Sequence, residues 1–80
     1  MMSAFVFIQV EEAEGGDEMS ALHDALHAVA GVKTVHFVAG PIDVIVFVDA
    51  ADQPALVDTL RAIRAVKGVA RTDTRNVWPV

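Results

Sequence analysis

FVFIQV (Phe5–Val10) is apolar at every position except Gln9, and VIVFV (Val44–Val48) is apolar throughout. A strand with one face in water alternates apolar and polar residues, so these stretches predict strands that are buried on both faces. The few helices that 80 residues allow can cover only one face of a sheet. We therefore expect the other face to meet a second chain.

The composition fits a single domain spanning residues 1–80. An isolated chain of this length buries only about 60% of its unfolded surface and is marginally stable. The hydrophobic content of 54% exceeds what a lone domain needs, and oligomerisation would bury the excess. The sequence has no cysteine, which excludes a disulfide framework, a thiolate metal site and a cysteine nucleophile.

Neither the N-terminus nor the charge points to a membrane or to nucleic acid. The start, MMSAF, lacks the basic region and cleavage site of a signal peptide, and no apolar stretch approaches the roughly 20 residues of a membrane helix. The net charge is −5, and residues 1–30 carry six acidic residues with no Lys or Arg. This disfavours attraction to phosphate backbones. We expect a cytoplasmic protein.

The chain reads as two copies of a strand-helix-strand unit. A shift of 37 positions sets LHAVAGV (Leu26–Val32) over IRAVKGV (Ile63–Val69) and lays the stretch from Phe5 onto the one from Ile42. Asp17 and Asp52 are placed to cap the two helices, and Gly31 and Gly68 to end them. The apolar stripes at helical spacing are Met19, Leu22, Leu26 and Val29 in the first helix and Leu56, Leu60 and Ile63 in the second.

The order β-α-β-β-α-β predicts an α+β fold, a ferredoxin-like sandwich with a four-stranded antiparallel sheet and both helices on one face. Right-handed crossovers place the first and third strands, which are the two apolar stretches, at the centre. The last strand, Val69–Val77, is polar and charged, as suits an edge. We expect the chain to dimerise, or to form a larger assembly, through the uncovered face of the sheet.

The connection between the second and third strands carries a resemblance to a known family. The pattern is a strand ending in Gly, one variable residue, an aromatic, Asp and an apolar strand, closed by a later Gly-Val and a Thr-x-Thr. The matching positions are Gly40, Pro41, Ile42, Asp43, Gly68, Val69, Thr72 and Thr74. Over essentially the whole chain, this resembles the effector-binding (RAM) domain of the Lrp/AsnC family of feast/famine transcriptional regulators. Ile42 departs from the family's aromatic.

The resemblance implies a noncatalytic module that binds a small effector, typically an amino acid, and dimerises through its sheet. Dimers in the family often join into rings, with effectors between dimers. The implied ligand-binding residues are Gly40, Pro41, Ile42, Asp43, Thr72 and Thr74. Full regulators carry an N-terminal helix-turn-helix domain, whereas only residues 1–3 precede the first strand here. We expect a stand-alone version that acts through full-length Lrp/AsnC partners and does not itself bind nucleic acid.

The chemistry of these residues leaves two readings open. Gly40 lets the backbone approach a ligand, Pro41 stiffens the turn, and the Asp43 carboxylate can accept hydrogen bonds from an ammonium group. The other reading is a tight hairpin turn in which Asp43 caps local N–H groups. Thr72 and Thr74 share one face of the last strand, where two hydroxyls can bind a carboxylate, but threonine is also a good strand former.

Three histidines raise metal and catalytic alternatives. His23 and His27, four residues apart on a helix, could both ligate zinc, but no third ligand is evident, so we predict no metal and no cofactor. His36 has no spacing that brings it near them. No nucleophile elbow or glycine-rich phosphate loop is present, and we predict no catalytic residue. The remaining alternative is a small dimeric α+β barrel enzyme, a cofactor-free oxygenase or isomerase, using His36 or His23 in a cavity.

Overall fold

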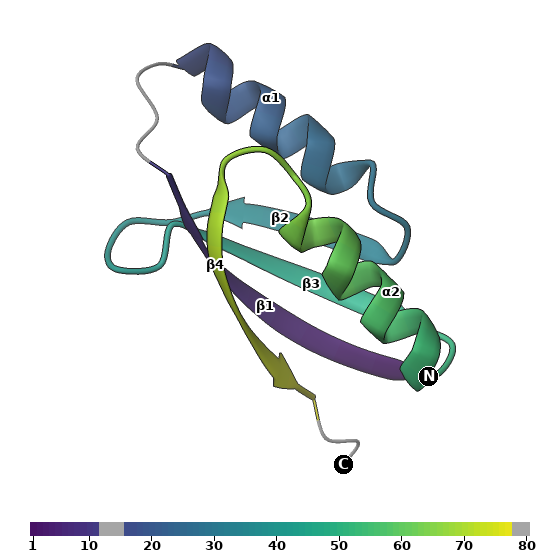
Figure 1. The fold of residues 1–80 in the computed structure, drawn as a ribbon. Helices are drawn as coiled ribbons and strands as arrows, with labels where there is room; N and C mark the ends of the chain where they lie inside the picture. The colour runs from purple at the N-terminus through teal and green to yellow at the C-terminus, as the bar shows by residue number, and fades with distance from the viewer. Residues whose placement is uncertain (12–15, 78–80) are drawn as a thin grey trace.

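The computed structural model describes residues 1–11 and 16–77. The elements are β1 (Met2–Val10), α1 (Gly16–His27), β2 (Val32–Phe37), β3 (Val44–Ala50), α2 (Gln53–Arg64) and β4 (Val69–Asn76). The strands form one antiparallel sheet in the order β2-β3-β1-β4, with the two apolar stretches at its centre (Figure 1). The predicted ferredoxin-like α+β sandwich is confirmed. Neither described helix is long and apolar enough to cross a membrane.

The ends of the helices differ in part from the prediction. Asp52 caps α2, because its carboxylate accepts a hydrogen bond from the Ala55 N–H at 2.9 Å. Asp17, the predicted cap of α1, lies in the first turn of that helix, which begins at Gly16.

Gly31 and Gly68 do not end the helices, which stop four residues earlier, at His27 and Arg64. Each helix is followed first by a turn closed by hydrogen bonds between residues three apart, from Val29 N–H to Leu26 O and from Val66 N–H to Ile63 O. The two glycines come at the end of these turns, directly before β2 and β4, with φ angles of 95° and 101°. These left-handed conformations favour glycine.

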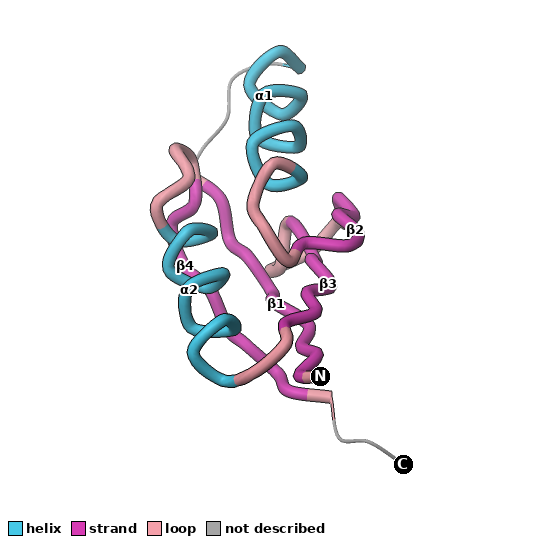
Figure 2. Tube along the Cα trace, turned by 90° about the vertical axis from the view of Figure 1, so that its right-hand side faces the viewer, coloured by secondary structure: helices cyan, strands magenta, loops and turns pink. Residues whose placement is uncertain are grey.

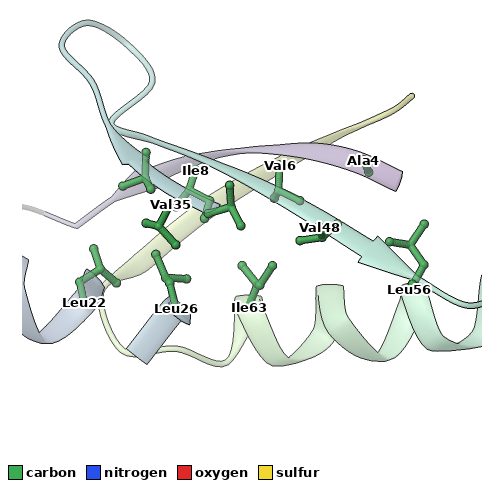
Figure 3. Close-up of a cluster of buried hydrophobic side chains, with 12 residues drawn as sticks. Ala4, Val6, Ile8, Leu22, Leu26, Val35, Val48, Leu56 and Ile63 are labelled. Carbon is green, nitrogen blue, oxygen red and sulfur yellow. The ribbon is translucent and has the colours of Figure 1, made fainter. Parts of the chain in front are cut away.

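The core lies between the sheet and the two helices (Figure 3). Helix α1 packs beside β2, and α2 beside β3 and β4 (Figure 2). The predicted apolar stripes contribute Leu22, Leu26, Leu56 and Ile63 to this core. The sheet contributes alternate residues, as a strand with one face on a helix layer should; they are Ala4, Val6, Ile8, Val35, Val44, Val46, Val48 and Ala50.

The opposite face of the sheet, called here the open face, is covered by neither described helix. Its centre is an apolar patch, the open-face patch, formed by Phe5, Phe7, Ile45 and Phe47. Phe5 lies opposite Phe47 and Phe7 opposite Ile45 in the pairing of β1 with β3. The Phe5 and Phe47 ring centroids are 5.0 Å apart, and Phe5 remains 42% exposed. The central strand pair thus presents aromatic surface that is partly exposed among the described residues.

Candidate functional site

The loop between β2 and β3 projects from one end of the sheet (Figure 1). It is closed by the Val38 N–H, which donates to the Asp43 carbonyl at 2.9 Å. Gly40 has a φ of +119°, and a Cβ at this position would meet no atom within 4 Å. The need for glycine is therefore one of backbone conformation, not of crowding.

Asp43 ties this loop to the end of β1. Its N–H donates to the Ile8 carbonyl at 3.0 Å, and its carboxylate Oδ2 accepts from the Val10 N–H at 3.0 Å. The Gln9 side chain adds a third link, because its amide nitrogen donates to the Pro41 carbonyl at 3.0 Å. Asp43 therefore caps an N–H group, as one of the two readings expected, but on a distant strand instead of within the turn.

Thr72 and Thr74 lie in β4 opposite Ile8 and Val6 of β1. Residues paired across an antiparallel sheet share a face, so both threonines are on the face that the helices cover, and both are half-buried. Their neighbours Arg71, Asp73 and Arg75 belong to the open face. The structure thus places the two threonines on one face, as predicted, and alternates them with charged residues.

A hollow of about 410 Å³ lies beside the loop at the edge of the open face, where it also reaches Thr72 of the opposite face. It is lined by Phe7, Gln9, Ile42, Arg71, Thr72 and Asp73. Of the six residues selected from the sequence, the hollow brings together Ile42 and Thr72 but not the other four. Arg71 and Asp73 were not among the residues selected from the sequence. Their period of two on β4 was the available signal, since it places both side chains on one face.

Two of the three charged residues at or near the hollow pair with each other, and the third, Arg71, does not take part in that pair. The Arg75 guanidinium contacts the Asp73 carboxylate, with Nη2 2.9 Å from Oδ2. Hydrogen bonding to Asp73, and then charge attraction to it, raises the pKa of Arg75. Both side chains are exposed, so this ion pair contributes little to stability. Among the described residues Arg71 forms no ion pair, and its positive charge at the hollow is not balanced by Asp73, which Arg75 already holds.

A second hollow, the alanine groove, lies between α2, the end of β3 and the turn before β2, with a volume of about 390 Å³. Its lining includes Ala30, Ala51, Ala62 and Thr59. Thr59 is buried, and its hydroxyl donates to the Ala30 carbonyl at 2.8 Å. No histidine lines either hollow. The arrangement that an enzyme using His23 or His36 requires is therefore not found at these two sites.

The histidines do not converge. His23 and His27 contact each other on α1, with ring centroids 4.5 Å apart, and His23 also contacts Phe37 at 5.6 Å. His36 pairs with Ile45 and so lies on the open face, on the other side of the sheet. The described residues contain no group of three or more His, Cys, Asp or Glu that could hold a metal ion.

Residues 3–78 match the family described as the Lrp/AsnC ligand binding domain. The chain belongs to the Lrp/AsnC family. The resemblance read from the residues around Gly40 and Thr72 is confirmed. No curated protein matches this Lrp/AsnC domain.

Solved structures support the family assignment. A protein from Thermus thermophilus, TTHA0845, is 31% identical with a TM-score of 0.82, covering 100% of this chain and 96% of that one. FFRP-DM1 is 25% identical with a TM-score of 0.79, covering 98% and 100%. The feast or famine regulatory protein Rv3291c of M. tuberculosis, complexed with L-methionine, is 28% identical with a TM-score of 0.80. This Lrp/AsnC domain spans 52% of that longer chain.

Proposed function

We propose that this Lrp/AsnC domain is noncatalytic, binds an amino acid as its effector and forms a homo-oligomer. The observation that carries the proposal is the hollow beside the β2–β3 loop, where Phe7 and Ile42 meet Arg71 and Asp73. An amino acid with an apolar side chain matches this combination, because its charged groups need polar partners and its side chain an apolar contact. The relative complexed with L-methionine supports the same ligand class.

The proposed effector site is built on this hollow of one chain, and in the assembly a neighbouring chain completes it. Its proposed residues are Gly40, Pro41, Ile42, Asp43, Thr72 and Thr74. Because Oδ2 of Asp43 accepts the Val10 N–H, Oδ1 is the oxygen offered to the effector's ammonium group. Ile42 in place of the family's aromatic makes the floor of the site smaller, and we expect weak affinity.

The proposed assembly uses the open-face patch as a dimer interface. The patch is apolar at its centre and polar at its edges, where β2 contributes Thr34 and His36 and β4 contributes Arg71 and Asp73. An apolar core with a polar rim is the usual anatomy of a protein interface. An 80-residue domain has a small core of its own, so covering Phe5 and its neighbours with a second copy adds substantial stability. Rings of such dimers are the proposed larger assembly.

The proposed effect on transcription is indirect. Both helices of the described residues pack on the sheet, so neither is free to enter a DNA groove as a recognition helix. The net charge of −5 opposes approach to a phosphate backbone. Transcription would therefore change through regulators of the same family that carry a DNA-binding domain and assemble with this chain.

Calorimetric titration of the purified protein with each of the twenty amino acids tests effector binding. We expect saturable binding of one or a few amino acids with apolar side chains, at one site per chain or per interface. The D-enantiomer of the tightest amino acid is the control, because a site that positions the carboxylate, the ammonium group and the side chain discriminates between mirror images. Absence of binding by all twenty would refute the proposed effector class.

A further inference from the structure

The hollow beside the loop differs chemically from the rest of the open face. The open-face patch is apolar, whereas the hollow, which borders the patch at Phe7, joins an apolar floor made by Phe7 and Ile42 to the charged residue Arg71. Phe7 and Ile42 are half-buried, so the floor is already partly dry before any ligand arrives. A hollow of this kind suits a ligand with one anionic end and one apolar end.

The backbone of Arg71 is held beside the loop by its pairing with β1. Its backbone pairs with Gln9 of β1, next to a register shift between Gln9 and Val10. The Gln9 side chain is held by its hydrogen bond to the Pro41 carbonyl, so the residue opposite Arg71 is anchored to the loop. The backbone of Arg71 is therefore held at a defined point beside the loop. The planar set of N–H donors of a guanidinium matches a carboxylate in two-point contact.

The neighbouring charges favour an anion at Arg71. Asp73 also lines the hollow, but its carboxylate is held by Arg75 at 2.9 Å, on the same strand. Three charged residues, Arg71, Asp73 and Arg75, alternate along the open face of β4 and leave one net positive charge in a chain whose overall charge is −5. Arg71 is therefore the charged residue of the hollow with which an anionic group of a ligand can pair.

We propose that Arg71 binds the carboxylate of the effector and that the effector's side chain lies on Phe7 and Ile42. This assignment rests on the proposed function, that the chain binds an amino acid, and adds a residue that the sequence pattern did not select. In this arrangement the selectivity for a carboxylate comes from Arg71, and the selectivity for the side chain comes from the floor.

The test combines two variants with a change in the ligand. Arg71→Gln removes the charge and keeps similar length, and Arg71→Lys keeps the charge but loses the two-point geometry. Arg64→Gln is the matched control, because it removes the same charge from an exposed position on α2, away from the hollow. Each protein is titrated calorimetrically with the twenty amino acids and with the primary amide of the one that the wild-type protein binds most tightly.

We expect the wild-type protein to bind the amide about 10- to 150-fold more weakly than the acid, because one charge-assisted contact is lost. Arg71→Gln should bind the acid as weakly as the amide, Arg71→Lys should fall between, and Arg64→Gln should match the wild-type protein. The amide titration uses the unaltered protein, so the test does not depend on the folding of a variant.

Three outcomes overturn the inference in distinguishable ways. If the wild-type protein binds none of the amino acids, the proposed function fails and the role of Arg71 fails with it. If an amino acid binds but its amide binds equally well, the site does not recognise the carboxylate. If Arg71→Gln keeps the wild-type preference for acid over amide, another residue holds the carboxylate, and the proposed function stands without Arg71.

Discussion

Replacing Phe5 by alanine should weaken dimerisation, whereas replacing Phe37 should not. The two side chains are matched controls for each other, being 42% and 40% exposed. Phe5 belongs to the open-face patch. Phe37 pairs with Val44 of the core and contacts His23 of α1, so it lies on the helix side of the sheet. Both substitutions remove the same ring, and only the face differs.

The size of the effect follows from the exposed area of Phe5. At 42% exposure and about 200 Å² for an aromatic side chain, Phe5 offers about 80 Å² to a second chain. Burial of that area contributes about 2 kcal/mol at about 25 cal/mol per Å². A two-fold dimer uses the contact twice, so Phe5→Ala should cost about 4 kcal/mol, which is about 1,000-fold in the dimer Kd.

Sedimentation equilibrium over a concentration series measures this dimer Kd for the wild-type protein and both variants. We expect Phe37→Ala to leave the Kd within a few-fold of the wild-type value. Equal weakening by both substitutions would show that the dimer does not use the open face. A wild-type protein that stays a monomer of 8.5 kDa at micromolar concentration would refute assembly itself.

Three further predictions concern the loops and DNA. Asp43→Ala leaves the Val10 N–H without its acceptor, so we expect the free energy of unfolding to fall by about 1–3 kcal/mol, and by less for Asp43→Asn, which keeps an acceptor. Thermal unfolding of both variants at one protein concentration measures this, and an unchanged Tm for Asp43→Ala would contradict the role of this contact. Gly31→Ala should destabilise the fold more than Gly40→Ala in urea unfolding. Both glycines have a positive φ, but a Cβ at Gly31 would lie 2.7 Å from the Thr59 hydroxyl, whereas a Cβ at Gly40 would meet no atom within 4 Å. Equal unfolding midpoints would refute this prediction. The purified chain should show no sequence-dependent binding to a random duplex DNA library at physiological salt by fluorescence anisotropy, and nanomolar binding would overturn an indirect role in transcription.

The fold could be predicted from the sequence because its strands and helices leave local patterns of apolar residues. Both central strands are almost continuously apolar, so the composition of Phe5–Val10 and Val44–Val48 indicates their central positions. The boundaries of the strands were predicted less accurately. β1 begins at Met2, three residues before the predicted start, because Met2 pairs with Ala50 at the far end of β3. Pairing between residues so distant in sequence leaves no periodic signal near either residue.

Residues of the candidate site could be predicted from the sequence only where they form a recognisable sequence pattern. The loop containing Gly40 and Asp43 was identified from the order of its residues, but the partner of Asp43, the Val10 N–H, lies 33 residues away. Arg71 and Asp73 were missed because their proximity to Phe7 and Ile42 depends on the register of β4 against β1 and on where the loop folds back. Charged residues on an edge strand usually signify only solvent exposure, so composition alone does not single them out.

Amide chemical shifts of isotope-labelled protein, recorded with a saturating amino acid, report both whether the effector binds and where it binds. We expect the largest shifts at Ile42 and at Arg71, Thr72 and Asp73, with small shifts in the helices. The largest shifts at Ala30 and Thr59, in the alanine groove, or no shift with any of the twenty amino acids, would contradict this expectation.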